Sequence, residues 1–122
     1  MLIGVDHTAI ASRNPFRLAQ WYERFLGFKI VAENDGKYFI QAANGTLLEI
    51  IPGEGEFLLP KMKDVGIRHI ALLVDDLSRS CDDLRKRGIE FTTDVLTVEP
   101  LRLSVIFFRD LDGNLLHLIH RG

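Results

Sequence analysis

The feature that most constrains the fold is an internal repeat of the sequence. The segment VDHTAIAS at 5–12 resembles IRHIALLV at 67–74, and TLLEII at 46–51 resembles NLLHLI at 114–119. The matched segments lie about 62 to 68 residues apart, a spacing typical of a duplicated structural unit. We therefore expect two copies of one supersecondary unit, with matched residues at equivalent places in each copy.

The first copy predicts one helix among four strands. Alternating apolar residues indicate a strand at 3–11, and Asn14 followed by Pro15 is a typical helix start. Leu18 begins an apolar stripe with helical spacing, and Gly27 ends the helix. Turn residues Asp35-Gly36 and Asn44-Gly45 separate further strands predicted at 28–33, 38–43 and 46–51.

The second copy follows the same order. A strand at 67–74 precedes a helix that starts near Asp76 and ends at Gly88. Further strands are predicted at 89–98, 103–108 and 115–120. The chain therefore reads as an α+β protein made of two βαβββ modules. We expect a single domain, with module one at 1–52, a linker at 53–65 and module two at 66–122.

Composition restricts the classes of partner. The 122 residues fit one compact domain, and 47% of them are hydrophobic, enough for a core. A net charge of −2 without a basic stripe argues against nucleic acid. We expect no signal peptide and no membrane span, because apolar runs are short. The single cysteine, Cys81, favours a reducing, cytoplasmic setting and a small buried side chain.

Four polar residues stand where strand neighbours are apolar, and they match in pairs across the repeat. His7 corresponds to His69, and Glu49 corresponds to His117. A carboxylate among apolar residues costs several kcal/mol unless it is paired or binds a metal, and the strand of Glu49 holds no Lys or Arg. Three imidazoles and one carboxylate suit Zn, Ni, Co or Fe(II). We therefore predict that the four residues bind one divalent metal ion.

Simpler interpretations exist for polar residues in strands. A single strand histidine is usually a hydrogen-bonded core or surface residue, and His120, beside the chain end, fits that description. The loop at 53–56 lacks the lysine and spacing of a phosphate-binding loop, and its acids would repel phosphate. The segment 110–114 is too short for an EF-hand and fits a tight turn. The metal interpretation depends on the repeated set as a whole.

At these residues the chain resembles the vicinal oxygen chelate superfamily, which includes glyoxalase I, bleomycin-resistance proteins and extradiol dioxygenases. The resemblance rests on the segments DHTAIAS, QWYERFLGFKIV, LLEII, IRHIALLVDDL and FFRDLDGNLLHLI. The nearest resemblance is to the single-domain, glyoxalase I-like branch, whose four strand positions carry His, Glu, His and Glu. Here His117 replaces the last Glu. The resemblance implies an open barrel-like mixed sheet around a metal-binding cleft, with helices outside, and a homodimer whose sites can be shared between chains.

The resemblance also implies a class of chemistry. A glyoxalase I-like isomerase or lyase (lactoylglutathione lyase-type) would act on a small substrate with vicinal oxygens through an enediolate-type intermediate. Glu49 would be the catalytic base, with glutathione as a candidate co-substrate if arginines such as Arg13 or Arg109 lie near the cleft. The alternatives are a dioxygenase or epimerase of the same superfamily, a thiol-adding resistance enzyme, and a non-catalytic antibiotic-binding resistance protein.

Overall fold

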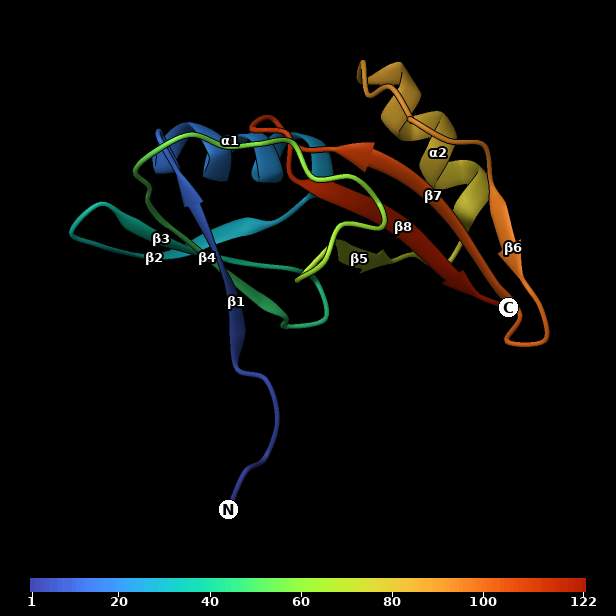
Figure 1. Cartoon of the computed structure of the whole chain (residues 1–122), viewed down its shortest axis with the longest axis horizontal. Helices are drawn as coiled ribbons and strands as arrows, with labels where there is room; N and C mark the ends of the chain where they lie inside the picture. Colours follow the sequence, from blue (N-terminus) through green and yellow to red (C-terminus); the bar gives the residue numbers. More distant parts are fainter. The chain divides into compact units, whose positions relative to one another are not determined.

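The computed structural model describes all residues, 1–122, and divides the chain into two compact units, Met1–Phe57 and Leu58–Gly122. Each unit holds one β-α-β-β-β module, so the predicted α+β architecture and its duplication are confirmed (Figure 1). That the two units form one domain with a linker at 53–65 stays a prediction. Neither helix has the length and apolar character needed to cross a membrane.

Unit 1 contains a four-stranded mixed sheet with one helix. Its elements are β1 (His7–Ser12), α1 (Pro15–Leu26), β2 (Lys29–Asn34), β3 (Lys37–Gln41) and β4 (Leu47–Pro52). The strand order is β1-β4-β3-β2, with β1 parallel to β4 and the other neighbours antiparallel. The tight β2–β3 turn has Asp35 and Gly36 at positive φ, as the Asp-Gly pair predicts.

Helix α1 begins and ends where its sequence predicts. The Asn14 side chain accepts a hydrogen bond from the Arg17 backbone N–H at 3.1 Å, and Pro15 starts the helix. Gly27 ends it in the left-handed conformation at φ 73°. The inner face of α1 is buried, as are side chains on one face of the sheet below it, and these residues are Leu18, Ala19, Tyr22, Ile40, Leu48 and Ile50.

Unit 2 repeats this plan. Its elements are β5 (Ile70–Leu73), α2 (Leu77–Lys86), β6 (Leu96–Val98), β7 (Leu103–Arg109) and β8 (Leu115–Arg121). The strand order β5-β8-β7-β6 corresponds to that of unit 1, again with one parallel pair, β5 and β8. Asp76 caps α2 by accepting from the Arg79 N–H at 3.0 Å. Cys81 is buried on the inner face of α2, as predicted.

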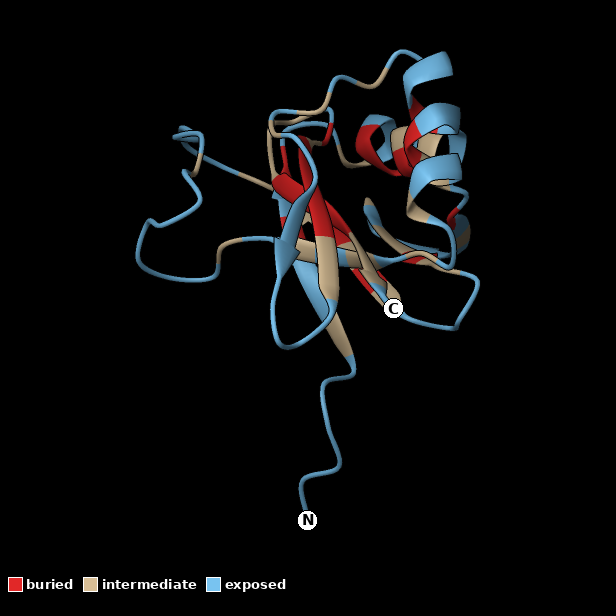
Figure 2. Cartoon of the chain, turned by 90° about the vertical axis from the view of Figure 1, so that its right-hand side faces the viewer, coloured by how far each residue is buried: buried red, intermediate tan, exposed pale blue.

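The strand predicted at 3–11 is wrong in its first part. Residues 1–6 form no strand, and the tail is exposed along its length (Figure 2). The parallel ladder between β1 and β4 begins at the pair His7 and Leu47, because residue 46 precedes the start of β4. The alternating pattern of the tail therefore has no neighbouring strand within unit 1. The strand predicted at 67–74 is likewise shorter, since only Ile70–Leu73 pair with β8.

The strand predicted at 89–98 is also mostly wrong, because only Leu96–Val98 pair with β7. The preceding stretch still approaches β7 through two threonines. The Thr92 N–H donates to the Phe107 carbonyl at 2.8 Å, while the Phe107 N–H donates to the Thr93 side-chain hydroxyl at 3.2 Å. The Thr93 hydroxyl thus replaces a backbone acceptor, and the regular ladder is interrupted there.

The two faces of the β7–β8 hairpin are both buried but hold different residues. Ile106, Phe108, Leu116 and Leu118 occupy one face. Val105, Phe107 and Leu115 form an apolar cluster on the other face, and Ile119 packs against it. His117 lies on this second face, directly opposite Phe107. The strand periodicity therefore places the predicted ligand His117 on the same face as this second apolar cluster.

Candidate metal centre

Unit 1 brings two predicted ligands together. His7 starts β1, and the register pairs Ala9 with Glu49, so the His7 and Glu49 side chains lie on the same face of neighbouring strands. The His7 Nε2 atom lies 3.5 Å from the Glu49 Oε1 atom. The Glu49 side chain is only 20% exposed, and His7 in its protonated form is the partner that a carboxylate in an apolar strand requires.

The other ring nitrogen of His7 is held by an adjacent carboxylate. His7 Nδ1 lies 2.8 Å from an Asp6 carboxylate oxygen. Because an ionised carboxylate only accepts hydrogen bonds, Nδ1 carries the proton. In the neutral imidazole the lone pair is then on Nε2, the atom next to Glu49. This carboxylate–histidine arrangement is the one that orients many metal-binding imidazoles.

Unit 2 brings the other two predicted ligands together. His69 immediately precedes β5, and the parallel register places Ala71 of β5 opposite His117 of β8. The His69 and His117 rings have centroids 4.2 Å apart at an interplanar angle of 45°. His117 is 5% exposed, and its Nδ1 lies 3.1 Å from the Leu118 carbonyl oxygen. Since a carbonyl only accepts, the proton is on Nδ1 and the lone pair of neutral His117 is again on Nε2.

The electrostatic settings of the two pairs differ. The hydrogen bond to Asp6 raises the pKa of His7, and the charges of Asp6 and Glu49 add to this effect. Desolvation lowers the pKa of His69. Burial also lowers the pKa of His117, and the neighbouring His69 lowers it further. Unit 1 therefore offers an acidic environment that attracts cations, whereas unit 2 offers imidazoles that favour the neutral, metal-binding form.

Comparison with known proteins assigns the chain to a family. A family model described as the Glyoxalase/Bleomycin resistance protein/Dioxygenase superfamily matches residues 4–118. The chain belongs to this superfamily. The matched range includes both modules and all four predicted ligands, so the family resemblance inferred from the sequence motifs is confirmed. The superfamily contains enzymes, and metal binding is common among its members.

Individual relatives match nearly the whole chain. It is similar to the protein YwbC of Bacillus subtilis (strain 168), with 26% identity over 125 residues that cover 96% of this chain and 97% of YwbC. It is similar to the glyoxalase family protein from Enterococcus faecalis, with a TM-score of 0.79, 25% identity and coverage of 95% and 96%. The glyoxylase/bleomycin resistance protein/dioxygenase domain from Frankia sp. EAN1pec shares the fold, with a TM-score of 0.74 at 23% identity over both whole chains.

For this superfamily member, the structure places the four predicted residues as two pairs, one in each unit. No group of three or more His, Cys, Asp or Glu side chains within either unit is arranged to hold a metal ion. Each pair would supply two of the four donors of the predicted site, and the residue types of the whole set are ones that bind divalent metals. Binding of one ion by His7, Glu49, His69 and His117 stays a prediction.

Three residues beside these pairs were missed by the sequence argument. Asp6 accepts a hydrogen bond from Nδ1 of His7. Phe39 of β3 lies directly opposite Glu49, and Phe107 of β7 lies directly opposite His117. The repeat contained a signal for the two phenylalanines, because each lies ten residues before the strand residue it faces. Apolar side chains in predicted strands are so common that this spacing was not informative alone.

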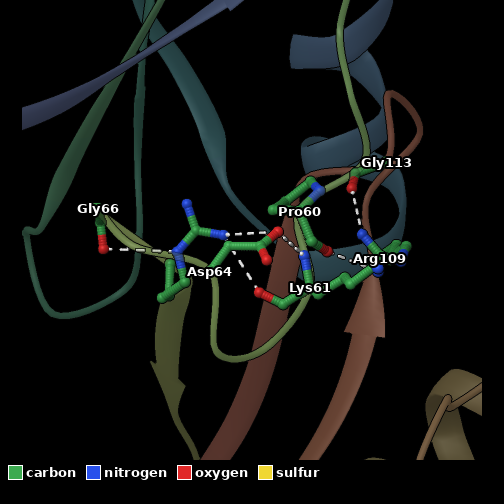
Figure 3. Close-up of polar contacts among 7 residues, drawn as sticks. Pro60, Lys61, Asp64, Gly66, Arg109 and Gly113 are labelled. Atoms are coloured by element: carbon green, nitrogen blue, oxygen red, sulfur yellow. Dashed lines mark hydrogen bonds and ion pairs between the residues drawn. The ribbon is translucent and has the colours of Figure 1, made fainter.

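Two arginines hold the segment before β5. Arg109 donates to the carbonyls of Pro60 and Gly113 at 2.8 and 3.0 Å (Figure 3). Arg68 donates to the Lys61 carbonyl at 3.1 Å and pairs with Asp64 at 3.7 Å. The backbone leading to His69 is thereby fixed at several points. Arg109 is engaged with carbonyls within its own unit, and Arg13 similarly donates to the Gly55 carbonyl.

Proposed function

We propose that this chain is a metal-dependent, glyoxalase I-like isomerase or lyase that acts on a small substrate with vicinal oxygens. His7 and Glu49 would provide one half of the metal site, and His69 and His117 the other half. The two halves would meet within one chain or across a homodimer. The observation that carries the proposal is the pairing of potential ligands at equivalent positions of both modules, on one face of each sheet.

The donor atoms of both pairs support metal binding. Hydrogen bonds from Nδ1 of His7 and of His117 leave Nε2 of each ring for coordination. The lowered pKa values of His69 and His117 keep both rings neutral near pH 7. A bound divalent ion supplies Lewis acidity toward the vicinal oxygens of the substrate.

Glu49 is the residue proposed to move the proton. It is the one carboxylate among the four, and it is half-buried between apolar neighbours. A carboxylate in this setting can remove a proton α to a carbonyl and return it to the neighbouring carbon. The nearby His7 ring, 3.5 Å from its Oε1 atom, restricts the positions that the carboxylate can take. Replacing the family's fourth Glu by His117 leaves the site one unit more positive and makes Glu49 the only candidate base among the ligands.

The test is an isomerase assay with a methylglyoxal–glutathione hemithioacetal, using protein loaded in turn with Zn²⁺, Ni²⁺, Co²⁺ or Fe²⁺. We expect Glu49→Gln to lose at least about a hundredfold in kcat at saturating metal, the usual magnitude for a general base. Glu33→Gln, an exposed carboxylate in the same unit, is the control. His117→Glu restores the family pattern and should retain activity. Full activity of metal-saturated Glu49→Gln would remove Glu49 as the base.

Other oxygen-bearing substrates should be tested in the same way. Arg13 and Arg109 are already engaged with backbone carbonyls, which reduces their value for binding the carboxylates of glutathione. A glutathione-free α-hydroxycarbonyl substrate therefore belongs in the assay beside the hemithioacetal. If only the glutathione-free substrate turns over, the proposed isomerase chemistry is supported and the proposal of glutathione as co-substrate is wrong. We also propose that the protein forms a homodimer, which a molar mass from light scattering would check. We further propose that it is located in the cytoplasm.

One observation favours a second candidate, a non-catalytic ligand-binding protein of the resistance type. Protonated His7, whose pKa is raised chiefly by Asp6 and also by Glu49, can pair with the Glu49 carboxylate, so the burial of Glu49 does not require a metal. Equilibrium dialysis of the purified protein against Co²⁺ separates the candidates. Binding of one ion per chain supports the enzyme, whereas no binding at millimolar Co²⁺ favours the binding protein.

A further inference from the structure

Two phenylalanines repeat with the proposed ligands, although the function described above gives them no role. Phe39 belongs to β3 and Phe107 to β7, the corresponding strands of the two modules. Phe39 is registered opposite Glu49, and Phe107 is registered opposite His117. Residues paired directly across antiparallel strands lie on the same face with neighbouring Cβ atoms. Each phenylalanine therefore shares its face with one half of the proposed site.

In unit 2, Phe107 touches both ligand rings. Its centroid lies 5.6 Å from the His69 ring at 87°, and 4.9 Å from the His117 ring at 69°. Both geometries are edge-to-face, the arrangement that aromatic pairs prefer. With the two imidazoles 4.2 Å apart, the three rings form one cluster in which rotation of either histidine would break a contact.

In unit 1, Phe39 makes the corresponding contact. Its ring lies 5.2 Å from the His7 ring at 78°, again edge-to-face. The match across the repeat is close, since both phenylalanines contact the first histidine of their module and face the fourth-strand residue. The same contact therefore recurs at equivalent positions of the two copies of the duplicated module.

The neighbouring aromatic residues of the same strands lie on the opposite faces and provide a comparison. Phe108 lies on the opposite face of β7, is fully buried and contacts Phe91. Tyr38 lies on the opposite face of β3 and contacts Phe16. Neither contacts a proposed ligand in these aromatic pairs. In each strand, therefore, one aromatic residue contacts a proposed ligand, and the aromatic residue next to it, on the opposite face, contacts another aromatic ring instead.

We propose that Phe39 and Phe107 are positioning residues that hold the imidazoles of His7, His69 and His117 in their metal-binding orientations, a role that rests on the proposed function. The flat ring restricts rotation of each imidazole at little entropic cost, because phenylalanine has only two side-chain torsions. It also presents an apolar wall beside the donor atoms, which limits access of water to them.

The first test measures Co²⁺ affinity by competition with a chelator. Phe107→Leu and Phe39→Leu remove the ring but keep an apolar side chain. We expect each to bind Co²⁺ about twofold to tenfold more weakly, the range that corresponds to loss of edge-to-face contacts. Phe108→Leu and Tyr38→Leu are matched controls, with the same change one residue away on the opposite face, and should bind Co²⁺ as the wild type does. Phe107→Tyr keeps the ring and should restore affinity.

The second test needs no metal. Long-range ¹H–¹⁵N spectra of the metal-free protein report which nitrogen of each histidine carries the proton. The wild type and Phe108→Leu should show His117 in the single Nδ1–H form, whereas Phe107→Leu should show a mixture of forms. Equal Co²⁺ affinities and equal spectra for Phe107→Leu and Phe108→Leu would overturn the positioning role. If the wild type binds no Co²⁺, the proposed function fails, and the spectra alone decide whether Phe107 orients the ring.

Discussion

Removing the carboxylate of Asp6 should weaken metal binding by changing His7 alone. Asp6→Asn keeps the size of the side chain but loses the charged acceptor that lies 2.8 Å from His7 Nδ1. Loss of such a partner typically weakens metal affinity about 10- to 100-fold. Asp6 is 85% exposed, so solvent screens its charge and the lower end of the range applies. We expect Co²⁺ affinity to fall about tenfold at pH 8.

The pH dependence gives this prediction a second, signed test. The hydrogen bond to Asp6 raises the pKa of His7, so Asp6→Asn should lower that pKa toward the ordinary value. Protons then compete less strongly for the His7 ring in the variant. The difference in Co²⁺ affinity should therefore narrow as pH falls from 8 to 6, with Glu33→Gln as the control. Equal affinities at pH 8, or a difference that widens at pH 6, would refute this account of His7.

Three further predictions concern stability and the anchoring of the chain. Because burial lowers the pKa of His117, the unfolded chain binds its proton more readily, and this group costs stability as pH falls below about 6.5. His117→Leu should thus lose less unfolding free energy than the wild type between pH 7.5 and 5.5 in urea titrations, and an equal or larger loss would contradict the assignment. Asn14→Ala removes the cap of α1 and should cost about 1 kcal/mol in the same titration at pH 7.5, with unchanged Co²⁺ affinity. Arg109→Ala frees the Pro60 carbonyl and should speed tryptic cleavage after Lys61, and an unchanged cleavage rate would show that the arginine does not hold this segment.

The architecture was predictable because local and repeated signals agreed. The cap at Asn14, the left-handed Gly27 and the Asp35-Gly36 turn all formed as the residue types predict. Because the second module repeats the first, the order of its helix and strands could be predicted by analogy. Strand lengths were less predictable, because pairing needs a neighbour. Residues 3–6 alternate like a strand but have no ladder partner in their unit, and Thr93 interrupts the ladder with its hydroxyl.

The candidate site was predictable as two pairs, although not in its surroundings. Burial of Glu49 and His117 among apolar neighbours signalled special residues, and the parallel strands placed each beside a histidine. Asp6 and the two phenylalanines were missed, since their role depends on cross-strand register and side-chain rotamers. Neither is encoded in residue spacing alone.

The central claim is that one divalent ion is bound by three imidazoles and one carboxylate drawn from both modules. X-ray absorption at the zinc edge of Zn²⁺-loaded protein, compared with His117→Glu, tests it most directly. We predict scattering from three imidazoles in the wild type and from two in the variant. Two or fewer imidazoles in the wild type, or the same spectrum for both proteins, would contradict the claim.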